Sequence, residues 1–237
     1  MSESVSDAIA RRVASHLRGG EIVNLGIGIP TLVADHLPDD VDVVLQTENG
    51  MLGVGPTPGP DAVDPNLVNA GKLPVSELAG ASYFSSSASF AMIRGGHVDV
   101  AILGALQLDG RGRIANWSIP GKPILGVGGA MDLLVGARRV IAATTHLAKD
   151  RTPKIVQDAT FPLTADRPVD LIVTEHATFA AGADGLTLIE IAPGTSQEWV
   201  AENTGAAFAV ALGAADADAP AAAVGAAATS SETEDER

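Results

Sequence analysis

The sequence predicts an α/β fold in which helices cover a single open, largely parallel sheet. Short apolar segments rich in Val, Ile and Leu alternate along the chain with segments of helical periodicity, an order typical of parallel sheets. Aromatic residues make up only 3% of the chain, so Ala, Val, Leu and Ile must fill the core, as they do around buried parallel strands. The 237 residues suffice for one large domain, and no long internal repeat or mid-chain linker divides them.

The first elements follow from apolar spacing and from Gly and Pro residues. Apolar residues recur at helical intervals up to Leu17, and Gly19-Gly20 then ends the helix. Pro30 suits the first turn of a second helix. In order, we expect a helix over residues 5–17, a strand over 21–25, a helix over 30–37 and a strand over 41–45. Many Gly, Pro, Asn and Asp residues over 51–82 predict long loops, with one short segment near 73–78.

The second half of the chain continues the alternation. Ser85-Ser86-Ser87 offers helix caps, and Gly95-Gly96 stops the helix that follows. The expected elements are a helix over 88–93, a strand over 97–103, a hairpin over 107–114, a short helix after residue 132, strands over 138–143, 169–174 and 186–191, and a helix over 196–202. Residues 1–213 therefore form the expected single domain.

The remaining residues, 214–237, form an Ala-rich tail with six acidic residues and one basic residue. We predict that this acidic tail is disordered and solubilising, with partner binding as the alternative. It carries −5 of the formal charge of −14, which leaves −9 on the body of the chain. Such acidity argues against nucleic acid as a partner, because phosphate binding needs a basic face.

Composition also bears on location and metal chemistry. No apolar run approaches the roughly 20 residues that span a bilayer, and the start of the chain lacks the order of a signal peptide, so we expect no membrane association and a cytoplasmic location. The absence of Cys excludes disulfides, thiolate catalysis and Cys-based metal sites. The five His residues lack the spacing of metal ligands, so we expect no metal site.

Glu48 lies just past the carboxyl end of the strand expected over 41–45, where α/β sheets gather their ligands. This position favours a reactive carboxylate. A solvated residue in a turn favoured by Asn49-Gly50 is the alternative.

Two glycine clusters resemble dinucleotide-binding fingerprints but are incomplete. Thr31 stands where the cluster at Gly26 and Gly28 needs its third glycine, and Met131 does so for residues 126–130. Open backbone N–H groups in such turns can hold an anion or a developing oxyanion. A tight turn between strand and helix is the alternative for both clusters.

Six motifs together resemble the B subunit of the 3-oxoacid CoA-transferases, over a similarity that runs from about Asp7 to Phe208. They are Thr47-Glu48-Asn49-Gly50-Met51-Leu52-Gly53, Asn69-Ala70-Gly71-Lys72, Gly80-Ala81-Ser82-Tyr83-Phe84, Phe90-Ala91-Met92-Ile93-Arg94-Gly95-Gly96-His97, Ala115-Asn116-Trp117-Ser118-Ile119-Pro120-Gly121-Lys122 and Gly126-Val127-Gly128-Gly129-Ala130-Met131-Asp132. Their order and spacing make chance agreement improbable.

The resemblance implies a CoA-transferase-like fold and an enzyme that moves CoA from succinyl-CoA to acetoacetate or 3-oxoadipate. Glu48 would be the nucleophile, forming a glutamyl-CoA thioester in a ping-pong reaction. Gly129 would donate its N–H group to the reacting carbonyl. The expected substrate or CoA contacts are Asn49, Gly126, Gly128, Ala130 and Lys122. CoA is then a substrate, and no cofactor is expected.

The resemblance also implies a partner, because in that family the B subunit works with an A subunit, and we expect a heterotetramer with two copies of each. The CoA phosphates need cations, which Lys122, Arg111, Arg113 or the A subunit would supply. Two segments depart from the family pattern. Thr145-His146 stands where many relatives carry Glu-His, and residues 174–177 read Thr-Glu-His-Ala instead of the commoner Thr-Asp-Leu-Ala. A phosphosugar isomerase and a non-catalytic ligand-binding module are the alternative functions.

Overall fold

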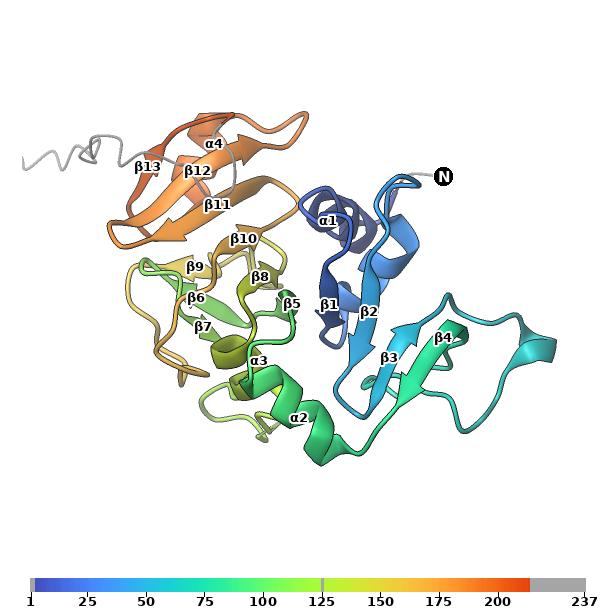
Figure 1. Cartoon of the computed structure of the whole chain (residues 1–237). Coiled ribbons are helices and arrows are strands. Elements are labelled where there is room, and N and C mark those ends of the chain that lie inside the picture. The colour runs from blue at the N-terminus through green and yellow to red at the C-terminus, as the bar shows by residue number, and fades with distance from the viewer. Residues whose placement is uncertain (1–2, 125, 214–237) are drawn as a thin grey trace, which may run out of the picture.

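The computed structural model describes residues 3–124 and 126–213, so the acidic tail over 214–237 lies outside the described residues. One open sheet of 10 strands runs through the molecule in the order β13-β12-β11-β10-β8-β5-β1-β2-β3-β4 (Figure 1). Its strands are β1 (Ile22–Leu25), β2 (Val44–Thr47), β3 (Met51–Val54), β4 (Glu77–Tyr83), β5 (Val100–Gly104), β8 (Arg139–Ala143), β10 (Leu171–Val173), β11 (Ala177–Gly182), β12 (Gly185–Ile191) and β13 (Phe208–Val210). The α/β prediction is confirmed.

The middle of the sheet is parallel and the ends are mixed. Strands β2, β1, β5, β8 and β10 pair in parallel. Antiparallel strands β3 and β4 extend one end, and β11 and β12 extend the other. A small second sheet has the order β7-β6-β9, built from β6 (Gln107–Asp109), β7 (Ile114–Ala115) and β9 (Ile155–Val156). Strands β6 and β7 form the predicted hairpin.

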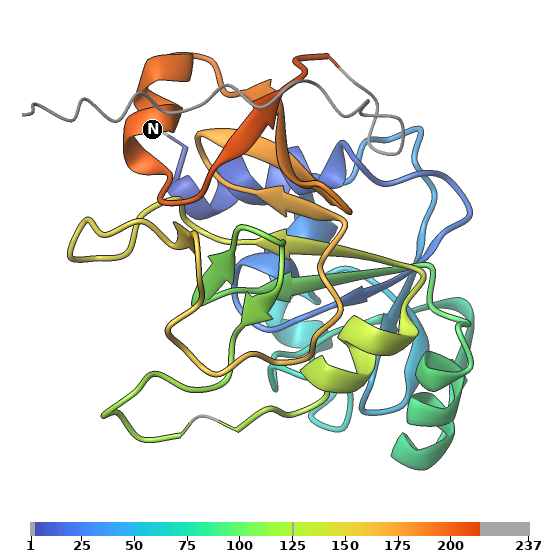
Figure 2. The ribbon, with the colours of Figure 1, turned by 90° about the vertical axis from the view of Figure 1, so that its left-hand side faces the viewer.

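The helices lie on both faces of the sheet, and each face has its own hydrophobic core (Figure 2). Helix α1 (Val5–Ala14) and the 3-10 helix η1 (Ile29–His36) pack on one face. Helices α2 (Ser86–Arg94), α3 (Ala130–Gly136) and α4 (Gln197–Asn203) contribute to the core on the other face, together with the small sheet. Within the described residues, no helix combines the length and apolar character that a bilayer crossing requires.

The prediction of loops over 51–82 is wrong for β3 and β4, since only the 3-10 turn η2 (Pro60–Ala62) and its flanks lie between them. Both strands contain glycines in the left-handed region, Gly53 at φ 86° and Gly80 at φ 88°, and the pairing is irregular between Leu52 and Val54. Glycine weakens a strand signal, so this composition resembled a loop. Strands β9, β11 and β13 were not predicted, and β2 begins at Val44, later than expected.

Candidate active site

Glu48 lies in the turn between β2 and β3, directly after the last residue of β2. The Gly50 N–H donates to the Thr47 carbonyl at 3.0 Å, and the Phe84 N–H donates to the Gly50 carbonyl at 2.9 Å. Gly50 has φ 125°, and a Cβ there would collide with the Phe84 carbonyl oxygen. The turn is therefore fixed, and it holds Glu48 at the carboxyl end of the parallel strands, as the sequence predicts.

A cleft of about 580 Å³ opens beside Glu48. The ends of β1 and β5 and the glycine loop over 126–130 form its walls. Its lining residues are Gly26, Ile27, Glu48, Leu103, Gly104, Ala105, Leu106, Asn116, Gly126, Val127, Gly128, Gly129, Ala130 and Leu133. The cleft therefore brings together five of the residues expected from the sequence, Glu48 and four from the glycine loop.

Glu48 is the one titratable residue among the residues that line this cleft. Its Oε2 atom is buried and has no hydrogen-bond partner within the described residues. A buried acceptor without a partner costs about 1–3 kcal/mol, so proteins keep such groups mainly where they have a function. With no second acid and no histidine in the lining, the cleft favours direct attack by the carboxylate over catalysis by an acid-base pair.

The glycine loop packs directly against this carboxylate. A Cβ on Gly129 would lie 3.4 Å from Glu48 Cγ, and 3.1 Å and 3.2 Å from two ring atoms of Phe90. Gly126 and Gly128 have φ values of 90° and 52°, in the left-handed region that favours glycine. The Gly128 and Gly129 N–H groups form no hydrogen bond within the described part of the chain. Open backbone donors therefore lie next to the candidate nucleophile.

The first glycine cluster contributes a wall of the cleft and a close contact between strands. The Gly26 N–H donates to the Ile102 carbonyl at 2.8 Å, and a Cβ on Gly26 would lie 2.8 Å from that oxygen. Gly28 precedes η1 with φ 92°, so the tight-turn interpretation applies here. Ile27, between the two glycines, is 68% exposed in the cleft lining.

Asn49 does not line the cleft, and its side chain holds a neighbouring loop. Its Oδ1 accepts from Thr47 Oγ1 at 2.6 Å, and its Nδ2 donates to the Val68 carbonyl at 2.8 Å. The Ala70 N–H in turn donates to Thr47 Oγ1 at 3.1 Å. These bonds tie residues 68–70 to the turn that carries Glu48.

The cations that were expected to meet CoA phosphates are distributed differently. Lys122 lies outside the cleft, in a second hollow that shares only Leu106 with it. Arg113 is paired with Asp109 at 2.7 Å and with Asp166 at 2.9 Å. Arg111 is exposed in the turn between β6 and β7. Among the described residues, no group of three or more potential ligands could hold a metal ion.

Sequence reasoning missed a buried polar chain beneath Glu48. Asn24 Nδ2 donates to Gln46 Oε1 at 2.6 Å, and Gln46 Nε2 donates to Ser89 Oγ at 2.8 Å. Asn24 and Gln46 are register partners on β1 and β2, and Gln46 is two residues before Glu48. Asn24 Oδ1 is a second buried acceptor without a partner within the described residues. Two amide side chains in otherwise apolar strands were the available signal.

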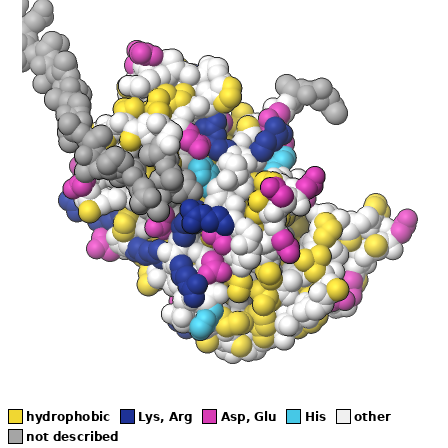
Figure 3. Space-filling view, turned by 45° about the horizontal axis from the view of Figure 1, so that its top comes forward, with side chains coloured by type: hydrophobic (Ala, Val, Ile, Leu, Met, Phe, Trp, Pro, Cys, Tyr) yellow, Lys and Arg dark blue, Asp and Glu magenta, His cyan; other side chains and the backbone are white. Residues whose placement is uncertain are grey.

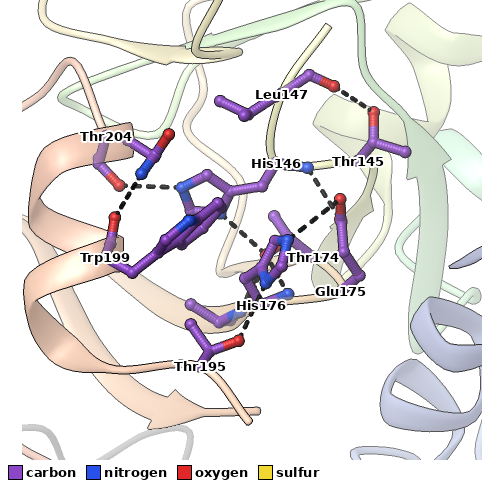
Figure 4. A network of polar contacts seen from close by, with 11 residues as sticks. Thr145, His146, Leu147, Thr174, Glu175, His176, Thr195, Trp199 and Thr204 are labelled. Carbon is purple, nitrogen blue, oxygen red and sulfur yellow. Dashed lines mark hydrogen bonds and ion pairs between the residues drawn. The ribbon is translucent and has the colours of Figure 1, made fainter. Parts of the chain in front are cut away.

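A second polar cluster lies at the ends of β8 and β10, near α4 (Figure 4). The His146 N–H donates to Glu175 Oε2 at 2.9 Å, and its ring nitrogens lie 3.1 Å from Thr174 Oγ1 and 3.0 Å from Thr204 Oγ1. Burial lowers the pKa of His146 to about 4, with His176 as a smaller cause in the same direction. The two segments that depart from the family pattern are therefore in contact, because Glu175 holds the backbone of His146.

The comparisons with known proteins agree with this geometry. Residues 6–203 match the family model described as Coenzyme A transferase. The chain is 51% identical over 203 residues to the beta subunit of the acetate CoA-transferase of Escherichia coli K12, covering 86% of this chain and 93% of that relative. It is 46% identical over 203 residues to the B subunit of the probable succinyl-CoA:3-ketoacid coenzyme A transferase of Bacillus subtilis 168, covering 86% and 94%.

The fold has counterparts among solved structures. The apoenzyme of an acyl-CoA transferase from Escherichia coli O157:H7 matches with a TM-score of 0.71 at 22% identity, over 92% of this chain and 46% of that one. At that identity the likeness shows the fold alone, whereas the family match and the two bacterial relatives, both of the B or beta type, carry more. The chain therefore belongs to the coenzyme A transferase family, as its motifs predict.

Proposed function

We propose that this chain is the B subunit of a CoA-transferase that moves CoA from succinyl-CoA to a 3-oxo acid, with Glu48 as nucleophile. The observation that carries the proposal is the buried, unpartnered Oε2 of Glu48 in a cleft with no other titratable lining residue. The name of the Bacillus subtilis relative supports the succinyl-CoA and 3-oxo acid pair. Acetoacetate and 3-oxoadipate are the candidate acceptors, CoA acts as a substrate, and no cofactor takes part.

The reaction uses the Glu48 carboxylate twice. A Glu48 oxygen attacks the thioester carbonyl, the carbon–sulfur bond breaks, and a mixed anhydride and CoA thiolate form. The thiolate then attacks the glutamyl carbonyl, which releases succinate and leaves a glutamyl-CoA thioester. The carboxylate of the 3-oxo acid attacks that thioester and repeats the two steps in reverse order. Ping-pong kinetics follow, because the first acid leaves before the second one reacts.

Gly129 is the proposed donor to the oxyanion of each tetrahedral step, and Gly126, Gly128 and Ala130 shape the loop that presents it. Support comes from the contact between Gly129 and Glu48 and from the unpaired N–H groups in the loop. A preorganised donor of this kind contributes on the order of 3 kcal/mol to the barrier reduction. Asn49 and Lys122 stay proposed substrate or CoA contacts, which Asn49 would make beyond its loop-holding bonds.

The proposed partner is a CoA-transferase A subunit, in a heterotetramer located in the cytoplasm. The relatives named as B or beta subunits support an enzyme built from two kinds of chain. The lining of the cleft supplies no cation for an anionic acyl group, which is consistent with a site completed by another chain. Mass measurement of the co-expressed subunits tests the stoichiometry, and cell fractionation tests the location.

Borohydride reduction tests the glutamyl thioester. The assembled enzyme is incubated with succinyl-CoA without acceptor and then reduced, which converts a glutamyl-CoA thioester at Glu48 to an alcohol. Peptide mass spectrometry should find the modification at Glu48 together with lost activity. A phosphosugar isomerase would form no thioester, and a binding module would show no transfer. An unmodified Glu48 in an enzyme that still transfers CoA would refute the mechanism.

Acetate is a second candidate acceptor, which the Escherichia coli relative favours through its name and its 51% identity. The acceptor is identified by comparing kcat/KM for acetate, acetoacetate and 3-oxoadipate with one preparation of the assembled enzyme. A preference for acetate would replace the 3-oxo acid proposal and leave the role of Glu48 unchanged.

A further inference from the structure

A second hollow of about 630 Å³ lies beside the cleft of Glu48. Leu106 lines both, and the loop that follows β7 passes from one to the other, since Asn116 lines the cleft while Ile119 and Lys122 line the hollow. The remaining lining residues come mainly from the segment between β8 and β9. They are Gln107, Thr145, Leu147, Ala148, Lys149, Asp150, Thr152, Pro153, Lys154 and Phe161.

The hollow concentrates positive charge in an acidic chain. Lys122, Lys149 and Lys154 line it, three of the four lysines in the sequence, whereas the body of the chain carries a net negative charge. Asp150 is the one acid in the lining, and its Oδ1 accepts from the Thr152 N–H at 3.1 Å and from Thr152 Oγ1 at 2.6 Å. The Asp150 carboxylate is thus bonded within its own turn.

Lys154 is the residue that points to a ligand. It is half-buried, and burial lowers the pKa of its ammonium group, an effect that Glu175 partly offsets. Its Nζ donates to Thr144 Oγ1 at 2.9 Å and forms no ion pair within the described residues. An ammonium group has three donors, and burying a cation is costly unless anions or acceptors compensate it. A bound anion would do so here.

We propose that this lysine-lined hollow binds the phosphate groups of CoA while the thioester end of the same molecule lies in the cleft of Glu48. The proposal rests on the proposed CoA transfer and specifies where the anionic end of the substrate is held. The phosphates and the sulfur lie at opposite ends of CoA, so one molecule must occupy two connected sites. Lysine binds phosphate as a point charge, and three lysines match a polyphosphate better than a single carboxylate.

The test is equilibrium binding by calorimetry with the chain assembled with its A subunit. The probes are CoA, CoA without its 3′-phosphate, and pantetheine, which has no phosphate. The variants are Lys122→Ala, Lys149→Ala and Lys154→Met. Arg111→Ala is the matched control, because Arg111 is exposed and lies outside the hollow but removes the same charge. Each lysine variant should weaken CoA binding about tenfold and leave pantetheine unchanged.

Other outcomes are decisive as well. CoA binding by the triple lysine variant at wild-type strength, or an equal loss in Arg111→Ala, would overturn the proposal. Weaker binding of succinyl-CoA but not of acetyl-CoA would mean that the hollow holds the acyl carboxylate, which also overturns it. Lys122 and Lys149 are exposed, so their variants should fold even if Lys154→Met does not. Because binding is measured without turnover, a failed borohydride test at Glu48 would not change these results.

Discussion

At the scale of single residues, Glu48 combines two demands that oppose each other. Its Oε2 is buried without a partner among the described residues, which is unfavourable for the folded chain, and the same isolation leaves the oxygen available for attack. Sites that serve chemistry commonly reduce stability in this way. The two demands separate when the side chain is removed.

Glu48→Ala should therefore abolish CoA transfer without destabilising the chain. Removing a buried acceptor without a partner offsets part of the lost packing, so we expect the free energy of unfolding to change by less than about 1 kcal/mol. Urea denaturation and a transfer assay on the assembled enzyme measure the two effects. Glu202→Ala, an exposed glutamate on α4, is the control and should change neither. Retained transfer in Glu48→Ala would exclude Glu48 as nucleophile.

Gly129→Ala should lower kcat more than it lowers stability. Gly129 has φ −83°, so alanine fits the backbone, but its Cβ would lie 3.1 Å from the Phe90 ring and 3.4 Å from Glu48 Cγ. A small displacement of the nucleophile is costly in rate, and we expect at least about a tenfold loss in kcat. Gly59→Ala is the control, because no atom lies within 4 Å of its Cβ position and its φ is −63°. Equal kcat values for both variants would contradict the prediction.

At the scale of elements, the β2–β3 turn is held by side chains from outside it. Asn49→Ala removes one bond to Thr47 and one to the Val68 carbonyl. We expect faster hydrogen exchange over residues 68–70 and a destabilisation of about 1 kcal/mol. Asn66→Ala is the control, since the Asn66 side chain bonds only to Asp64 in the same loop. Unchanged exchange over 68–70 in Asn49→Ala would mean that the tether has no energetic role.

The His146 cluster joins three elements and predicts a pH dependence of stability. Burial lowers the folded-state pKa of His146 to about 4, below the unfolded value of 6.5, so the unfolded chain binds more protons between these values. This contribution is complete above pH 6.5 and is lost as the pH falls towards 4, by about 3 kcal/mol. His176, whose pKa burial also lowers, acts in the same direction.

Urea denaturation from pH 7 to 4 tests this dependence. His146→Gln should lose less stability over that range than the parent chain, because it lacks the group that must be protonated. His97→Gln is the control, since His97 is exposed and outside the cluster, and it should follow the parent curve. Parallel curves for the parent and His146→Gln would show that His146 does not titrate as proposed.

The sequence predicted those elements whose signal is local. Apolar runs predicted β1, β5, β8 and β12, and glycine pairs or serine caps marked the ends of α1 and α2. It missed β3 and β4 because their pairing with β2 and with each other outweighs a glycine-rich composition. Motif resemblance brought Glu48 and Gly129 together. The position of Lys122 in a separate hollow depends on distant segments, which no local pattern encodes.

At the scale of the whole molecule, the sheet ends in strands with unpaired edges. Strand β4 is one end of the 10-stranded sheet, and nearly all its residues are exposed. Leu78 and Tyr83 on this strand are 46% and 55% exposed. Figure 3 shows one face of the molecule, on which hydrophobic side chains gather in its lower part while basic and acidic side chains lie mainly elsewhere. Exposed apolar edges of this kind pair with other chains unless they are covered.

We therefore expect the chain without its A subunit to self-associate through β4 as its concentration rises. Leu78→Lys places a charge on the edge strand and should shift association to higher concentration, because lysine on an edge opposes strand pairing. Val63→Lys is the control, since Val63 is 41% exposed and follows η2 outside the sheet. Sedimentation velocity over a concentration series measures the effect. If the parent chain stays monomeric, or if both variants shift alike, β4 is not the contact, whereas a shift in Leu78→Lys alone assigns the association to this edge.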